Sequence, residues 1–235
     1  MTSDMTSNIK SGMSSEDYTA LLCSLPHLVN PFKYQSQSIS LVQLQKRMNM
    51  LSYDDYVWLN KLRQLFYWGG ISLDQDEAVL VKQAQRFMDE LNNDNIKSWL
   101  LWRMDIRSII SAMRRRKQGQ SAPKGTLWAY GNYINHIGNN WSSPCFKLEN
   151  RYPFLPEIEK HLKAGESFEL ECCLLKAVWH FYSTRQPENE YSFAAVILYL
   201  MKWDLIDRWR QYDTELGAQR FSQLVQECLP TELEI

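Results

Sequence analysis

The segment Trp99-Leu-Leu-Trp-Arg-Met-Asp-Ile-Arg-Ser-Ile-Ile-Ser-Ala-Met-Arg-Arg-Arg-Lys-Gln-Gly119 decides the fold expected for this chain. Large apolar residues recur in it at intervals of three or four positions: Trp99, Trp102, Ile106, Ile109, Ile110 and Met113. This spacing puts them on one side of an α-helix, so it predicts a long amphipathic helix with a buried stripe. Asp105 lies at the margin of the stripe, and four consecutive cations, Arg114 to Lys117, follow it.

Comparable patterns predict helices at residues 41–48, between Ser52 and Gly69, and at 74–91, 156–162, 167–185, 191–211 and 214–229. Ser52 and Ser167 each precede acidic residues and are predicted as N-caps. Residues 126–137 fit either a helix or irregular structure, and residues 136–144 are predicted to form a loop. Because no segment alternates convincingly between apolar and polar residues, the sequence predicts an all-α fold, a bundle of long helices.

The breaks between these patterns predict a domain organisation with two helical blocks. Residues 1–17 are polar and contain no apolar run of a signal peptide, so they are predicted to form a disordered leader. The first helical block is predicted at 18–137 and contains the arginine-rich helix. A connector is predicted at 138–152, a second helical block at 153–229, and a tail at 230–235.

Composition excludes several classes of protein. The net charge is −1, so no overall field attracts nucleic acid or a membrane surface. The longest apolar runs are far shorter than the roughly 20 residues that a membrane-spanning helix needs. The five cysteines are odd in number and have no Cys-x-x-Cys spacing, which indicates reduced, buried thiols in a cytoplasmic protein.

No motif nominates a reaction. The four histidines are scattered without the spacing of metal ligands, and His180 is expected to be a packed helix residue. The chain contains none of the sequence motifs of nucleotide-binding loops, zinc proteases or serine hydrolases. The sequence therefore predicts no catalytic residue, cofactor or metal, and a protein that is not an enzyme.

The basic end of the arginine-rich helix is the main candidate for an interface. One interpretation is a solvated cationic end that complements the helix dipole. The other is a contact with an acidic partner protein through five cations: Arg107, Arg114, Arg115, Arg116 and Lys117. Nucleic-acid binding is the weaker variant, because the chain lacks a second basic stripe. Asp105 is expected to pair inside the structure, with Arg103 or with a neighbouring helix.

Three segments together resemble a known family. Tyr18-Thr-Ala-Leu-Leu-Cys-Ser-Leu-Pro-His-Leu28 and Ser192-Phe-Ala-Ala-Val-Ile-Leu-Tyr-Leu-Met-Lys-Trp-Asp-Leu-Ile-Asp-Arg-Trp209 resemble the opening and a late helix of a poorly characterised bacterial family associated with V/A-type ATPases. The run from Trp102 to Gly119 is similar to a signature of the funnel-shaped central-stalk protein of these ATPases. The positions that correspond to this signature are Asp105, Ile106, Ser108, Arg114 and Arg116.

The resemblance implies a non-catalytic coupling role. The central-stalk proteins of this family form a helical funnel that seats the rotor shaft and rests on the membrane-embedded proteolipid ring. They are longer and built as a threefold helical repeat, so this chain would be a truncated funnel of two blocks. The implied partners are the shaft and ring proteins, and the implied location is the cytoplasm, at the inner face of the membrane. The alternative is a generic helical protein-binding adaptor unrelated to the ATPase.

Overall fold

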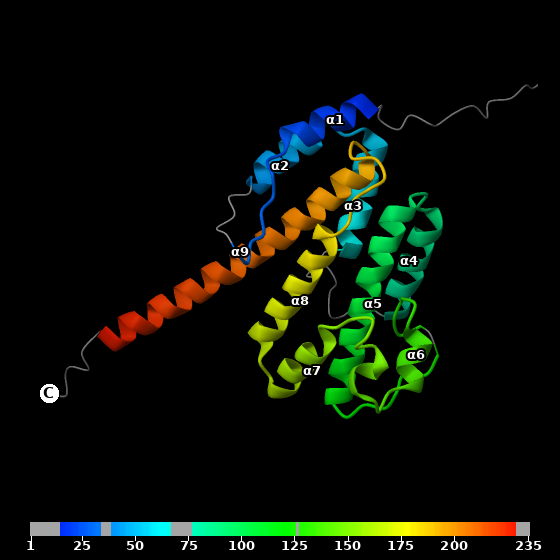
Figure 1. Cartoon of the computed structure of the whole chain (residues 1–235), viewed down its shortest axis with the longest axis vertical. Helices are drawn as coiled ribbons and strands as arrows, with labels where there is room; N and C mark the ends of the chain where they lie inside the picture. The colour runs from blue at the N-terminus through cyan, green and yellow to red at the C-terminus, as the bar shows by residue number, and fades with distance from the viewer. Residues whose placement is uncertain (1–14, 34–38, 67–76, 126, 229–235) are drawn as a thin grey trace, which may run out of the picture.

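Helices make up the architecture, which confirms the all-α prediction (Figure 1). The computed structural model describes residues 15–33, 39–66, 77–125 and 127–228, and these ranges contain no β-strand. The elements in chain order are α1 (Ser15–Ser24), α2 (Leu41–Met48), α3 (Tyr53–Phe66), α4 (Glu77–Glu90), α5 (Asp94–Lys117), α6 (Ile134–Asn139), η1 (Pro144–Lys147), α7 (Leu155–Ala164), α8 (Ser167–Ser183) and α9 (Phe193–Cys228). Within the described residues, no helix combines the length and the apolar character needed to cross a membrane.

Helix α5 is the predicted arginine-rich helix, and it passes through two separate hydrophobic cores. Its first half, including Trp99 and Leu100, packs in a core shared with α1 to α4, the second half of α8, and α9. Its second half, from Ile106 to Met113, packs in a core shared with α6, η1, α7 and the first half of α8. Because both cores use α5, this helix is buried on more sides than the single predicted stripe.

Helix α8 also joins the two cores, since Leu170 and Leu174 belong to one and Leu175 and Val178 to the other. Each core therefore draws residues from both of the helical blocks expected at 18–137 and 153–229. The expected connector, 138–152, is part of the second core through Cys145, Phe146 and Leu148. The two cores are thus joined through two continuous helices, with no linker between them.

Helix α9 differs from the sequence prediction. The sequence predicts two helices, at 191–211 and 214–229, but one continuous helix spans Phe193–Cys228. No proline interrupts this range, and the one glycine in it, Gly217, lowers helix propensity without ending the helix. The first half of α9 packs against α1, α3, α5 and α8, and its later part extends beyond the other helices (Figure 1).

Several predicted boundaries can be compared with the structure. Ser52 accepts a hydrogen bond from the Asp55 amide at 3.2 Å, as predicted for an N-cap, whereas Ser167 is not the N-cap of α8. The loop predicted at 136–144 is wrong in its first part, because α6 continues to Asn139. The predicted disordered leader 1–17 is wrong for residues 15–17, which begin α1. Residues 1–14 and the predicted tail 230–235 lie outside the described residues.

Asp105 fastens the segment after α5 to the middle of that helix. Its carboxylate accepts hydrogen bonds from the amide and side chain of Asn132, at 2.6 and 3.1 Å, and from the Tyr152 hydroxyl at 3.2 Å. Gly131 is needed there, because its φ is +153° and an added Cβ would overlap Oδ1 of Asp105. Asp105 therefore pairs with backbone and side-chain donors of another segment rather than with Arg103.

We expect Gly131→Ala to lower the free energy of unfolding by about 3 kcal/mol, because the methyl group would displace Asp105 and the backbone conformation disfavours it. Gly119→Ala is the matched control, since its φ is +76° but nothing lies within 4 Å of its added Cβ. That control should lose only about 1 kcal/mol. Urea denaturation measures both values, and equal losses would contradict the role assigned to Asp105.

Candidate interaction groove

An open groove of about 950 Å³ runs along α8. Each successive turn of α8 contributes two adjacent residues to the lining of the groove. The first pair is Phe168 and Glu169, and the last pair, Thr184 and Arg185, lies just beyond the C-terminal end of the helix. The opposite wall consists of residues 151–154, Glu157 and His161 of α7, and Trp102 of α5. The groove therefore follows one face of α8 over its whole length.

Aromatic stacking shapes the far end of this groove. The rings of Trp102 and Phe181 are stacked with centroids 3.8 Å apart and planes inclined by 8°. The guanidinium of Arg185 lies 4.4 Å from the centroid of the Phe181 ring. A stack of this kind holds the arginine plane in place while its edge can still donate hydrogen bonds.

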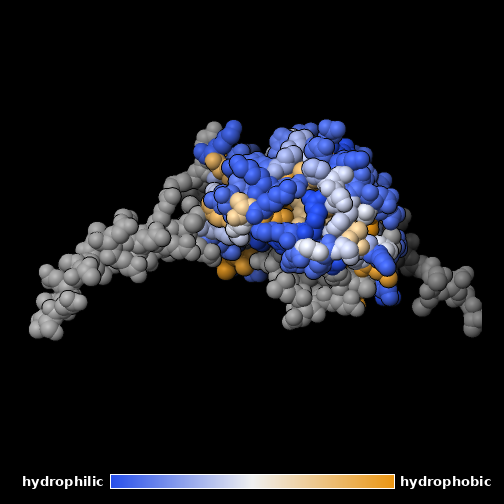
Figure 2. Space-filling model, turned by 90° about the horizontal axis from the view of Figure 1, so that it is seen from below, coloured by the Kyte–Doolittle hydropathy of each residue, from blue (hydrophilic) through white to orange (hydrophobic). Residues whose placement is uncertain are grey.

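Figure 2 shows the end of the molecule at which α6 and α7 lie. Hydrophilic residues dominate this face, and hydrophobic residues appear both near its centre and at its margins (Figure 2).

Charge is distributed unevenly along the groove. Glu169 lines the end at the start of α8, and Glu157 of α7 lines the groove one turn further along, beside Cys173. Arg151 and Arg185 line the other end, where a smaller cavity of about 290 Å³ contains both arginines and the Asp105 carboxylate. His180 is exposed and lines the groove, so the expectation of a packed histidine is wrong. Its position becomes apparent only once the register of α8 is known.

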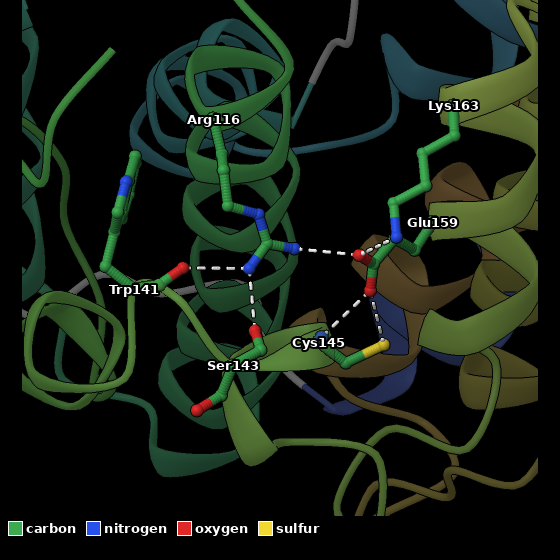
Figure 3. A network of polar contacts seen from close by, with 6 residues as sticks. All are labelled: Arg116, Trp141, Ser143, Cys145, Glu159 and Lys163. Atoms are coloured by element: carbon green, nitrogen blue, oxygen red, sulfur yellow. Dashed lines mark hydrogen bonds and ion pairs between the residues drawn. The ribbon is translucent and has the colours of Figure 1, made fainter. Parts of the chain in front are cut away.

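The cations at the end of α5 do not form a single exposed edge. The Arg116 guanidinium turns inward and donates to the carbonyls of Trp141 and Ser143, at 2.9 and 2.6 Å (Figure 3). It also forms an ion pair with Glu159 of α7 at 2.9 Å and lies over the Phe146 ring. Arg116 therefore makes its hydrogen bonds inside the fold, and its place in a partner interface stays a prediction.

The other predicted interface cations have different environments. Arg115 lies 5.8 Å from the Trp128 ring centroid, and Lys117 donates to the Leu162 carbonyl of α7. Arg107 is half-buried, and Arg114 is exposed to solvent. A contact through Arg107, Arg114, Arg115 and Lys117 stays a prediction, and of these four Arg114 and Lys117 are exposed.

The Arg116 network supports an unfavourable backbone conformation in η1. Cys145, Phe146 and Lys147 have φ values of 46°, 55° and 59°, and each non-glycine residue in this region costs about 1–2 kcal/mol. Glu159 accepts hydrogen bonds from the Cys145 amide at 2.9 Å and from its thiol at 3.1 Å (Figure 3). Arg116 and Glu159 therefore hold both sides of this turn.

Electrostatics in the network favour the ionised carboxylate. Burial alone would raise the pKa of Glu159, but hydrogen bonds from Lys163 and Cys145, together with the charge of Arg116, hold it below its usual range. Burial and the neighbouring Glu159 raise the pKa of the Cys145 thiol to about 12. Burial and Glu157 likewise raise the pKa of Cys173 to about 12. Both thiols are therefore poor nucleophiles at neutral pH.

The thiols differ in accessibility. Cys145 and Cys173 are buried, as expected from the sequence, but Cys23 is exposed, so that expectation is wrong for Cys23. In the part of the chain that the structure describes, no three His, Cys, Asp or Glu side chains are grouped to hold a metal ion.

A second cavity, of about 430 Å³, lies on another face of α8 and is bordered by α9. It is lined by charged residues that include Arg63, Arg103 and Asp204. Arg63 of α3 lies 3.7 Å from the Asp204 carboxylate. Burial raises the pKa of Asp204 to about 6, while the charges of Arg63 and Arg103 act in the opposite direction.

We expect Arg116→Met to lower the free energy of unfolding by about 3 kcal/mol, because it removes one of the two cations paired with Glu159 and the donor to the Trp141 and Ser143 carbonyls. Glu159→Gln should cost a similar amount, and the double variant less than the sum, since both act on one network. Arg114→Met is the matched control in the same helical turn and should change stability by less than about 0.5 kcal/mol. Equal effects of Arg116→Met and Arg114→Met in urea denaturation would contradict the role of the network.

The raised pKa of Asp204 predicts a pH dependence of stability. Between the ordinary Asp pKa of about 4 and the folded value of about 6, the folded chain binds a proton that the unfolded chain releases. Stability should therefore fall as pH rises through this window and stay level above it. Relative to Asp204→Asn, the wild type should lose up to about 3 kcal/mol across the window. A difference between the two chains that is independent of pH would exclude this assignment.

Comparison with known proteins places the chain in a family. The model of a family described as "Protein of unknown function (DUF2764)" matches residues 34–230. No curated protein and no solved structure matches the chain significantly. Because the family match covers most of the 235 residues, the chain belongs to the DUF2764 family of proteins of unknown function.

Proposed function

We propose that this chain is a non-catalytic structural or coupling component, or an accessory, of a V/A-type ATPase, linking the rotor shaft and the membrane ring. The observation that carries the binding role is the groove along α8, which is open to solvent over the length of a helix. The assignment to the ATPase rests on the resemblance of three segments, at residues 18–28, 102–119 and 192–209.

The construction of the helices supports a mechanical role. Helix α5 spans 24 residues and α9 spans 36, so each is about 35–55 Å long. Because α5 is buried in both cores, a force applied at one core would be carried to the other by a continuous helix. In this proposal the chain works in the cytoplasm and meets the membrane only through the ring proteins.

The alternative is a helical adaptor for an unrelated protein, and one observation favours it. Among the described residues, large exposed hydrophobic side chains concentrate around α2 and the start of α3, at Leu41, Val42, Met50, Tyr53 and Tyr56. Exposed apolar residues of this kind mark protein-binding surfaces in general and carry no preference for an ATPase.

The test is native purification of the tagged full chain from the organism that encodes it. We expect the shaft and ring proteins of the ATPase to co-purify in stoichiometric amounts. Arg151→Glu combined with Arg185→Glu should reduce this yield by about tenfold or more, because it reverses the charge at one end of the groove. Arg86→Glu combined with Lys124→Glu is the control, because both side chains are exposed and lie outside the groove.

Two outcomes would contradict the assignment. Recovery of a different protein in stoichiometric yield, without ATPase components, would support the adaptor alternative. Recovery of ATPase components at the same level with the charge-reversed groove would show that the groove is not the binding surface.

A further inference from the structure

The size of the groove fits one helix of a partner protein. Helix α8 has 17 residues, so the groove beside it is about 25 Å long. In the middle of the groove α8 contributes the small residues Cys172 and Ala177 beside the long side chain of Lys176, and toward the ends it contributes Phe168 and Phe181. Small central residues let a second helix axis approach closely, and the aromatic residues enclose it at either end.

The charges along the groove give it a direction. Glu169 lies where α8 begins, and Glu157 lies one turn further along, beside Cys173 and 3.8 Å from His161. Arg151 and Arg185 lie where α8 ends. Among the described residues neither arginine lies within 4.0 Å of a carboxylate oxygen, although the charge of Arg151 acts on the Asp105 carboxylate in the same cavity. Lys176 and His180 also line the groove, and along α8 they lie between Glu169 and Arg185. Basic residues therefore become more frequent toward the end of α8.

An α-helix has a matching polarity of its own. Acidic residues are favoured in the first turn of a helix and basic residues in the last, because they complement the helix dipole. Such a helix matches the groove only when its first turn lies beside Arg151 and Arg185 and its last turn beside Glu157 and Glu169. It must then run antiparallel to α8.

The arginine end supplies a specific anchor. Arg151 and Arg185 line the same cavity of about 290 Å³, and the Arg185 plane is held on the Phe181 ring. Two guanidinium groups on opposite walls form a clamp for a carboxylate, which arginine binds through paired hydrogen bonds. The glutamates at the other end would repel a nucleic-acid backbone, so the charge pattern favours a helix over an oligonucleotide.

From these observations we infer that the groove binds an amphipathic helix of a partner protein, antiparallel to α8, with an acidic first turn clamped between Arg151 and Arg185. This inference deepens the proposed function, because it names the surface and the chemistry of the partner. It rests on the protein-binding role and does not require that the partner belong to an ATPase.

The test is selection of displayed helical peptides of about 18 residues, the length of α8, against the full chain. Equal thirds of the library carry acids in the first turn and bases in the last, the reverse order, or no charges, with the apolar positions randomised. We expect enrichment of the acid-first peptides by at least about tenfold over both other classes. The double variant Arg151→Gln, Arg185→Gln should abolish the preference for acid-first peptides. Because glutamine is neutral, this variant removes the two positive charges without introducing charges that would repel the acidic turn.

Orientation and specificity are checked with the same peptides. A photo-crosslinker on the N-terminus of enriched peptides should mark Arg151 and residues 180–185, and one on the C-terminus should mark residues 157–173. The matched control is Arg86→Glu with Lys124→Glu, because both side chains are exposed, lie outside the groove and belong to no predicted interface. Its enrichment pattern should equal that of the wild type.

Three results would overturn the inference. They are equal enrichment of the acid-first and base-first peptides, absence of enrichment of any helical class, and N-terminal crosslinks beside Glu157 and Glu169. Binding of a single-stranded oligonucleotide that is lost in the Arg151 and Arg185 variant, without helix enrichment, would assign the groove to nucleic acid. Because no ATPase component takes part, failure here and failure of ATPase co-purification are separate results.

Discussion

The ion pair between Arg116 and Glu159 determines where α7 lies, and the other features of the groove depend on that position. Arg116 comes from the last turn of α5 and Glu159 from the middle of α7, so the pair fastens the two helices together. The same carboxylate holds the Cys145 amide, and the same guanidinium holds two carbonyls before η1. Helix α7 then supplies one wall of the groove along α8.

Polar residues of α5 therefore act mainly within the structure. Asp105 holds the segment around Asn132, and Ser108 donates a hydrogen bond toward the Met104 and Tyr130 carbonyls. Asp105 and Ser108 are each only 3% exposed, and at such burial an unsatisfied polar group would be costly. The helix that looks most like a binding edge in the sequence is thus the scaffold, and the exposed face of α8 offers the larger binding surface.

The sequence allows accurate prediction where local rules are sufficient. The helical spacing of Trp99, Ile106 and Met113 identifies α5, and the pattern at residues 41–48 identifies α2. Prediction fails where no local signal marks the outcome. The chain around residues 212–213 carries weak capping residues but no proline, so packing and helix continuity decide that α9 is unbroken.

The candidate site is less predictable than the fold. A sequence places Arg114 and Arg116 two positions apart, about 200° around a helix, but does not say which of them meets a carboxylate from α7. For His180 the sequence predicts a packed residue, because its neighbours are apolar, but the side chain is exposed on the groove. The part of the groove wall that Arg151 forms could not be inferred from the sequence, because residues 151–154 belong to an irregular segment without a periodic pattern.

The sequence by itself determined that this protein is built of helices, because apolar spacing and helix propensity act over a few residues. The spacing of apolar residues also determined which side chains of α5 could pack in a hydrophobic core. Only the tertiary structure decided that α5 and α8 each serve two cores, that Arg116 faces inward, and that Arg151 and Arg185 share one end of a groove. These outcomes depend on contacts between residues such as Arg116 and Glu159, 43 positions apart, which no local pattern specifies.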